Sequence, residues 1–212
     1  MNPHLIILTI GIFYTLIFGA LSLLRREGLS TQFAIESVVI TIVVIGIAWL
    51  TSTAVDPLPF LIFIYLVTMR GRLLVDLANA LSSRGRQRDA IKLLQWAMSL
   101  LPDRSTRLVI QVNMGIVQLR RKNPASAQAL FEEVLREMEA GGGLGIKYEA
   151  ACRYNLGKAL MRQGKEPEAV RQFNEVMVIY PSSIYSKAAG MALEERRSRT
   201  RGKTDEPLNG SS

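Results

Sequence analysis

Long apolar runs dominate residues 1–70 of the chain. Residues 5–24 contain no charged side chain, and residues 37–55 form a second uncharged run that is rich in valine and isoleucine. At about 1.5 Å of rise per residue, a helix of either length reaches across most or all of a hydrocarbon core of about 30 Å. A buried strand usually extends over only about 4–8 residues. The pattern therefore predicts two membrane-spanning helices.

A third apolar segment occupies residues 58–69, next to a break that Pro57 and Pro59 impose on the chain. This segment is short for a complete crossing of the bilayer. The sequence by itself leaves three interpretations open: a short or tilted crossing, an interfacial helix, or the beginning of the part that follows.

Arginines next to the apolar runs indicate the topology. Arg25 and Arg26 follow the first run, and Arg70 and Arg72 follow the third segment. Positively charged residues near the ends of membrane helices stay on the cytoplasmic side. Three crossings place both pairs in the cytoplasm, whereas two crossings would place one pair outside. We therefore expect a multi-pass protein of a bacterial plasma membrane, with the chain after residue 70 in the cytoplasm.

The net charge lies entirely outside the apolar runs. The chain has 26 Lys+Arg and 18 Asp+Glu, a formal charge of +8, but residues 1–70 hold three basic and three acidic residues. Cys152 is the single cysteine and His4 the single histidine. A disulfide framework, a cysteine-rich zinc site and histidine-based catalysis are therefore excluded or disfavoured. No enzyme motif is present, and we expect neither a cofactor nor a metal.

From residue 71 onward the apolar positions follow the 3.6-residue period of helices, and the sequence repeats itself at about 34 residues. Eight positions of residues 71–104 reappear without a gap in residues 150–183: Leu77, Ala78, Leu81, Gly85, Ala90, Leu94, Ala97 and Pro102 correspond to Leu156, Gly157, Leu160, Gly164, Ala169, Phe173, Val176 and Pro181. Residues 108–141 align with both through a third set of positions: Met114, Gly115, Ala127, Phe131 and Val134.

This pattern resembles the tetratricopeptide repeat, in which two antiparallel helices cross closely at small residues. The resemblance implies an all-α fold, in which the membrane helices of residues 1–70 precede a helix-hairpin solenoid over residues 71–198. Its parts would be three units, a capping helix and a disordered tail: 71–104, 108–141, 150–183, 184–197 and 199–212. The middle unit departs from the pattern, because Lys122-Asn123-Pro124 replaces the turn glycine. The glycine-rich stretch 141–145 is an insertion before the third unit.

The same resemblance implies a binding groove, because these arrays generally hold peptides or helices against the first helix of each unit. Counting along those helices gives the candidate lining: Val75, Asn79, Val112, Ile116, Tyr154, Lys158, Met161 and Arg162. This mixed apolar and basic lining favours an amphipathic, mildly acidic segment of a partner protein. Binding of a chaperone tail is disfavoured, because the basic positions used for it are Val75, Ala151 and Asn155 here. The alternative is that Val112, Ile116 and Met161 simply pack between helices.

Two further features suggest contacts outside the groove. A basic run near the C-terminus could meet anionic lipid headgroups at about 1 kcal/mol per residue, or could simply be solvated: Arg196, Arg197, Arg199, Arg201 and Lys203. Nucleic acid is an unlikely partner, because no groove-reading motif or stacking platform accompanies the run. Gly11, Thr15 and Gly19 share one helix face, where another helix can approach closely. That helix is either the chain's own second span or a second copy in a homo-oligomer.

These observations predict a membrane-anchored scaffold or adaptor that recruits a protein partner to the cytoplasmic face of the membrane. The alternative is an accessory subunit that braces a larger membrane complex. A transporter is disfavoured, because Glu36 and Asp56 lie at the ends of the second apolar run rather than at its centre. Cys152 is expected to be a buried thiol, although its neighbour Arg153 could lower its pKa.

Overall fold

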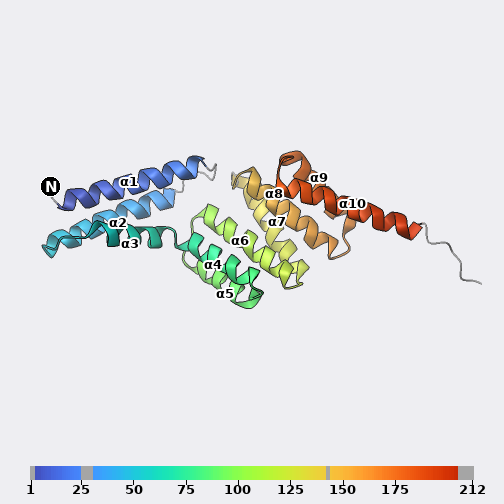
Figure 1. Cartoon of the computed structure of the whole chain (residues 1–212), viewed down its shortest axis with the longest axis horizontal. Helices are drawn as coiled ribbons and strands as arrows, with labels where there is room; N and C mark the ends of the chain where they lie inside the picture. Colours follow the sequence, from blue (N-terminus) through green and yellow to red (C-terminus); the bar gives the residue numbers. More distant parts are fainter. Residues whose placement is uncertain (1–2, 25–30, 142–143, 205–212) are drawn as a thin grey trace, which may run out of the picture. The chain divides into compact units, whose positions relative to one another are not determined.

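The computed structural model describes residues 3–24, 31–141 and 144–204, and these residues form ten α-helices and no strand (Figure 1). The all-α fold class is therefore confirmed. The helices are α1 (Pro3–Leu24), α2 (Thr31–Leu50), α3 (Pro57–Thr68), α4 (Arg70–Ser83), α5 (Gln87–Ser99), α6 (Arg104–Arg120), α7 (Pro124–Gly141), α8 (Ile146–Met161), α9 (Glu166–Ile179) and α10 (Ile184–Thr204).

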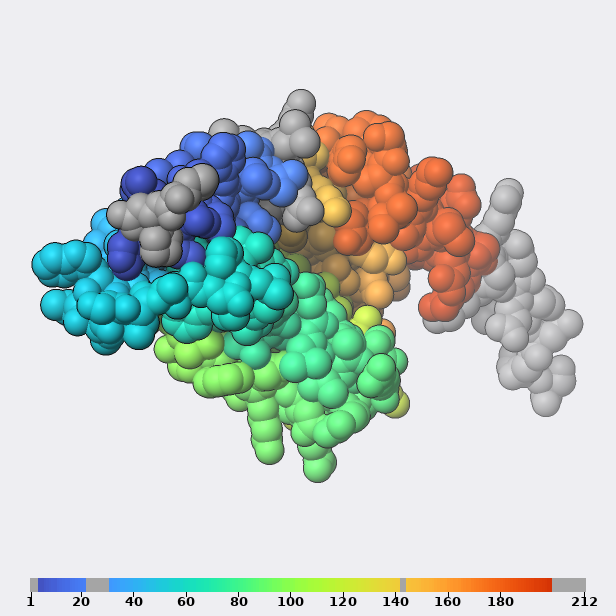
Figure 2. All heavy atoms as spheres, turned by 60° about the vertical axis from the view of Figure 1, so that its left-hand side comes forward, coloured from blue at the N-terminus to red at the C-terminus, as the bar shows by residue number. Residues whose placement is uncertain are grey.

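The chain divides into two compact units, Met1–Val117 and Gln118–Ser212, which are described separately. The expected boundary between a membrane part and a repeat part, at residue 70, therefore falls inside the first unit. At that point α3 gives way to α4 with a bend of 72°. Figure 2 shows the teal atoms of α3 continuing into the green atoms of α4 and α5.

Helices α1 and α2 are each long and apolar enough to cross a membrane. The predicted limits of the second helix, 37–55, are wrong at both ends. At the start, Gln32 Nε2 donates to Glu36 Oε1 at 2.8 Å, one helical turn apart, so a polar pair extends the helix back to Thr31. At the end, the chain turns after Leu50, and Ser52 takes a positive φ of 51°.

Helix α3 begins with a cap that the proline-rich break supplies. The Asp56 carboxylate accepts from Leu58 N at 3.1 Å, and Pro57 occupies the first helical turn, where its missing N–H is not needed. Twelve residues give a length of about 18 Å, which is less than the hydrocarbon core. A third span is available only if α3 and α4 are counted as one broken helix. Three crossings stay a prediction, and Arg25 and Arg26 lie outside the described residues.

Small residues bring α1 against α2 within the same chain. A Cβ added to Gly11 would lie 2.4 Å from Thr41 Oγ1 of α2, so only glycine fits at this contact. Thr15 Oγ1 meanwhile donates to the Gly11 carbonyl at 2.9 Å. Gly11 therefore packs against the chain's own second helix, one of the two partners that the sequence left open for this face. A homo-oligomer through the face of Gly11, Thr15 and Gly19 stays a prediction.

A paired charge joins the apolar helix α2 to the beginning of α4. Arg70 Nη1 donates to Glu36 Oε2 at 2.6 Å, and Arg70 Nη2 donates to Glu36 Oε1 at 2.9 Å. Arg70 Nη2 also reaches the Leu100 carbonyl, at 3.3 Å, in the loop between α5 and α6. The pair borders a cavity of about 270 Å³ that Phe18, Phe33 and other side chains of this unit line. Sequence analysis treated Glu36 and Arg70 separately and did not predict their contact.

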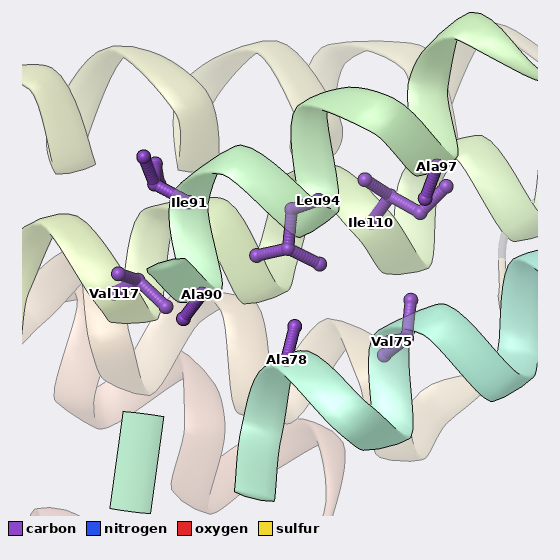
Figure 3. Close-up of a cluster of buried hydrophobic side chains, with 8 residues drawn as sticks. All are labelled: Val75, Ala78, Ala90, Ile91, Leu94, Ala97, Ile110 and Val117. Carbon is purple, nitrogen blue, oxygen red and sulfur yellow. The ribbon is translucent and has the colours of Figure 1, made fainter. Parts of the chain in front are cut away.

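The first repeat hairpin packs as the small-residue pattern predicts. Ala78 of α4 and Ala90 of α5 are fully buried at the helix crossing, with Leu94 between them and α6 (Figure 3). The cluster is completed by five more buried side chains: Val75, Ile91, Ala97, Ile110 and Val117. Val75 therefore lies in the hydrophobic core of this hairpin.

In the second compact unit, α7, α8 and α9 pack in the same way as the first hairpin. Phe131, Phe173 and Ala169 are buried between them. Gly157 of α8 faces Phe173 of α9, and a Cβ there would lie 2.6 Å from Phe173 Cε1. The glycine thus accommodates the aromatic ring that fills the core.

The capping helix α10 packs on α9 and α8 and continues to Thr204, beyond the predicted limit of residue 197. Residues 199–204 are therefore helical, which corrects the prediction of a disordered tail from residue 199. The cause is local, because Glu195 and Arg199 form an ion pair one turn apart, and arginine and lysine favour helices. Residues 205–212 lie outside the described residues.

The contact between Gly157 and Phe173 predicts opposite effects of the same substitution at two helical glycines. Gly157→Ala should destabilise the full chain by about 1–3 kcal/mol, because the ring cannot move away from the new methyl group without repacking. Gly190→Ala should stabilise it by about 0.5–1 kcal/mol, because its Cβ meets only Met177 Sδ, at 3.9 Å, and alanine favours helix. Denaturant unfolding in detergent, followed by circular dichroism, measures both; equal effects would contradict the crossing at Gly157.

The turn that lacks a glycine predicts a stabilising substitution. Lys122 has φ 61° at the position where the other two units have Gly85, φ 80°, and Gly164, φ 75°. A left-handed conformation costs a lysine roughly 1–2 kcal/mol, partly offset by glycine's greater freedom when unfolded. Lys122→Gly should therefore raise the free energy of unfolding by about 0.5–1 kcal/mol. Lys122→Ala keeps the strained backbone and should bring no gain, so equal stability of these two variants would contradict the explanation.

Candidate functional site

A groove of about 630 Å³ lies in the second unit among α8, α9 and α10. Four of the side chains predicted from the sequence line it from the α8 side: Tyr154, Lys158, Met161 and Arg162. The other side chains come from the beginning and middle of α9 and from α10: Glu166, Phe173, Ala192, Glu195, Arg196 and Arg199.

The spacing of residues along α8 explains how one face reaches the groove. Tyr154, Lys158 and Arg162 are four residues apart and therefore lie above one another on the same face. The residues between them are buried against the neighbouring helices, as Leu156 and Ala159 show. One face of α8 therefore packs in the core. The other face carries an amphipathic, basic stripe of Tyr154, Lys158 and Arg162.

An aromatic platform supports this stripe. The Tyr154 ring lies 5.9 Å, between centroids, from Phe173 of α9 and 5.9 Å from Tyr185 of α10. Lys158 Nζ lies 5.4 Å from the centroid of the Tyr154 ring, a cation–π distance. Burial raises the pKa of the Tyr185 hydroxyl, so this ring stays neutral at physiological pH. The platform therefore offers apolar contact area beside positive charge.

The cations of the stripe lack carboxylate partners. Burial lowers the pKa of Lys158, and the positive charges of Arg162 and Arg120 lower it further. Among the described residues, no carboxylate pairs with Lys158. Arg162 Nη1 donates to the Leu119 carbonyl, at the end of α6, at 2.5 Å. A carboxylate that entered the groove would relieve this repulsion between cations.

Arg153, on the same helix, provides a contrast. Its guanidinium lies 2.9 Å from the Glu149 carboxylate and 3.7 Å from that of Glu139, and it donates to Gln172 Oε1 at 3.4 Å. Arg153 is therefore neutralised within the chain and serves the packing of α8. From the sequence, Arg153 was noted as a neighbour that could lower the pKa of Cys152.

Part of the C-terminal basic run lies at the rim of the groove. Arg196 Nε donates to Glu166 Oε2 of α9 at 2.7 Å, and Arg199 pairs with Glu195 on its own helix. Arg197 is exposed. The side chains of Arg201 and Lys203 lie outside the described residues, although their backbone belongs to α10. Lipid contact through this run stays a prediction.

The remaining predicted groove residues belong to the first compact unit. Val75 and Val112 are buried, which gives them a packing role, and Ile116 is half-buried. Asn79 is exposed on α4. A binding role for these four positions stays a prediction.

The contribution of α10 to the groove was not predicted from the sequence, which indicated only a capping helix over residues 184–197. Ala192, Glu195, Arg196 and Arg199 follow the spacing of one helical face, and this signal identifies a fourth lining helix.

Cys152 lies on the opposite, packed side of α8. Burial raises the pKa of its thiol to about 12, although the charge of Arg153 acts in the lowering direction. Its Sγ lies 3.4 Å from the Phe131 carbonyl, which accepts a hydrogen bond from the thiol. The expectation of a buried, inert cysteine agrees with this environment, and a lowered pKa does not.

A family model described as the tetratricopeptide repeat matches residues 151–183, which include most of α8 and all of α9. No curated protein matches the chain. The chain therefore contains a tetratricopeptide repeat at its third predicted unit, the one that forms the groove. Such repeats typically act as protein-interaction modules without catalytic activity.

The raised pKa of Cys152 predicts resistance to alkylation. A thiol with a pKa of about 12 stays protonated at about pH 8, and the thiolate is the reactive species. Iodoacetamide should therefore modify the folded chain far more slowly than the denatured chain, as mass spectrometry would show. An exposed cysteine introduced by Ser83→Cys should react at an ordinary rate, with a pKa near 8.5. Rapid modification of Cys152 in the folded chain would contradict its burial.

Proposed function

We propose that this protein is a membrane-anchored adaptor whose groove among α8, α9 and α10 holds an amphipathic, acidic segment of a protein partner. The observation that carries the proposal is the basic stripe of Lys158 and Arg162 beside the Tyr154 ring, for which the described residues supply no carboxylate partner. No catalytic role is proposed.

The chemistry of the groove supports a partner of this kind. Lys158 and Arg162 are one turn apart, so a single carboxylate, or two on successive turns of a partner helix, can meet both. Tyr154, one turn earlier, supplies an apolar ring with a polar tip, a type of residue that is enriched at protein interfaces. The groove therefore matches acidic and apolar residues that alternate along a helix or extended segment.

Membrane attachment is supported by α1 and α2, which are long and apolar enough to cross a bilayer. We propose three crossings, with α3 as the short third, in a bacterial plasma membrane. Arg70 and Arg72, by the tendency of positive charges to stay inside, favour a cytoplasmic location for the repeats. In this arrangement Val75 and Val112 support the helices, while Asn79 and Ile116 remain candidate contacts along the array.

A bracing subunit of a larger membrane complex is the second candidate. Its support is the contact of α4 and the α5–α6 loop with the membrane helices through Arg70, Glu36 and Gln32. A repeat hairpin held in this way can transmit rigidity to the spans. On this alternative, the partner would bind the membrane helices, and the groove would be dispensable.

Charge reversal separates the two functions. The full-length, tagged chain is purified in mild detergent from the organism that encodes it, and associated proteins are quantified by mass spectrometry. Lys158→Glu/Arg162→Glu should reduce recovery of the partner by about tenfold or more, because losing a buried charge contact costs on the order of 2 kcal/mol. The helical signal should change little, because neither Lys158 nor Arg162 belongs to the buried core of the unit.

Arg171→Glu/Lys187→Glu is the matched control, because it changes the net charge equally at exposed positions of α9 and α10 that do not line the groove. This control should keep the partner. Full recovery of every associated protein with the groove variant would overturn the adaptor proposal and favour the bracing subunit.

A further inference from the structure

The corner between α5 and α6 presents large apolar side chains to the surroundings. Leu101, in the loop, is 82% exposed, and Trp96, in the last turns of α5, is 56% exposed. The apolar residues of α5 that pack inward, such as Leu94 and Ala97, are fully buried. The two exposed side chains therefore contribute nothing to the core of the first repeat.

Hydrogen bonds tie this corner to the first turns of α2. Gln32 Nε2 donates to the Leu101 carbonyl at 2.9 Å, and Arg70 Nη2 donates to the Leu100 carbonyl at 3.3 Å. Arg70 in turn holds Glu36, which is one turn from Gln32 on the same face of α2. The corner therefore lies level with the point where the polar beginning of α2 gives way to its uncharged part.

The backbone of the loop is strained in a way that its packing does not explain. Leu101 has φ 50°, the left-handed region that glycine adopts freely and that leucine adopts only at a cost. A leucine that is almost entirely exposed gains no compensating burial within the chain. Burial within the chain therefore explains neither the choice of leucine at this position nor its exposure.

We propose that the α5–α6 corner, formed by Trp96 and Leu101, inserts into the lipid at the headgroup level beside α2. The occupant is lipid because the corner is continuous with the polar end of a helix suited to span the bilayer. Tryptophan is enriched at this level of membranes, where its ring meets both apolar and wet surroundings. The corner thereby fixes the tilt of the first repeat hairpin against the membrane. This inference rests on the proposed membrane crossing by α2.

The test uses the full-length chain with Cys152→Ala as background and one new cysteine per variant, labelled with an environment-sensitive NBD fluorophore. Leu101→Cys reports on the corner. Val43→Cys, on an exposed apolar face of α2, reports on the membrane crossing itself. Ser83→Cys reports on an exposed position at the end of α4, at the opposite end of the α4–α5 hairpin, about 20 Å away. Each variant is reconstituted into liposomes with and without nitroxide-labelled phospholipids.

The label at Leu101 should shift its emission to the blue and lose intensity to the nitroxide lipids, as the label at Val43 does. The label at Ser83 should keep the emission of an aqueous dye and respond to iodide instead. A water-like label at Leu101, with quenching at Val43 intact, overturns the inference while membrane crossing stands. A blue-shifted label at Leu101 that nitroxide lipids do not quench also overturns it, because a protein surface then covers the corner. Equal lipid quenching at Ser83 overturns the assignment to this corner.

Discussion

The ion pair between Glu36 and Arg70 is the constraint on which the arrangement of the first unit depends. A carboxylate in the second turn of a helix as apolar as α2 is costly unless a cation meets it. Arg70 does so through both of its terminal nitrogens, and it can only do so because α3 is short enough to return the chain to this level. The beginning of α4 is thereby fixed beside α2. Arg70 also donates to the Leu100 carbonyl, so the end of α5 is held beside the beginning of α4.

A different constraint organises the second unit, where Phe173 fills the space that Gly157 leaves open. Because the close contact lies on one face of α8, the opposite face is free to carry polar groups. The Tyr154 ring bridges the two faces, since it touches Phe173 and also lies under Lys158. The core contact and the candidate groove therefore share α8. The groove residues on this helix are held in place by the packing of its other face.

The periodicity of the sequence predicted the positions where helices cross closely. It failed to predict helix limits and contacts that depend on single side chains. The small residues Ala78 and Gly157 could be placed because the repeat needs close crossings at fixed intervals. The limits of α2 and α10 were wrong because the Gln32–Glu36 and Glu195–Arg199 pairs extend helices that hydropathy alone would end. Four groove residues on α8 could be predicted from the register of one helix. The contribution of α10 could not be, because it requires knowing which face of a capping helix meets its neighbour.

Positive charge on α8 distinguishes groups that stabilise the fold from groups available for binding. Arg153 is matched by Glu149 and Glu139, as expected for a cation that serves structure. Lys158 is partly buried and repelled by neighbouring cations, so its charge lowers the stability of the unit on its own. A cluster of this kind gains free energy only when an anionic group arrives. Since the aromatic platform also favours an apolar neighbour, the same few residues specify both the sign and the amphipathic character of the partner.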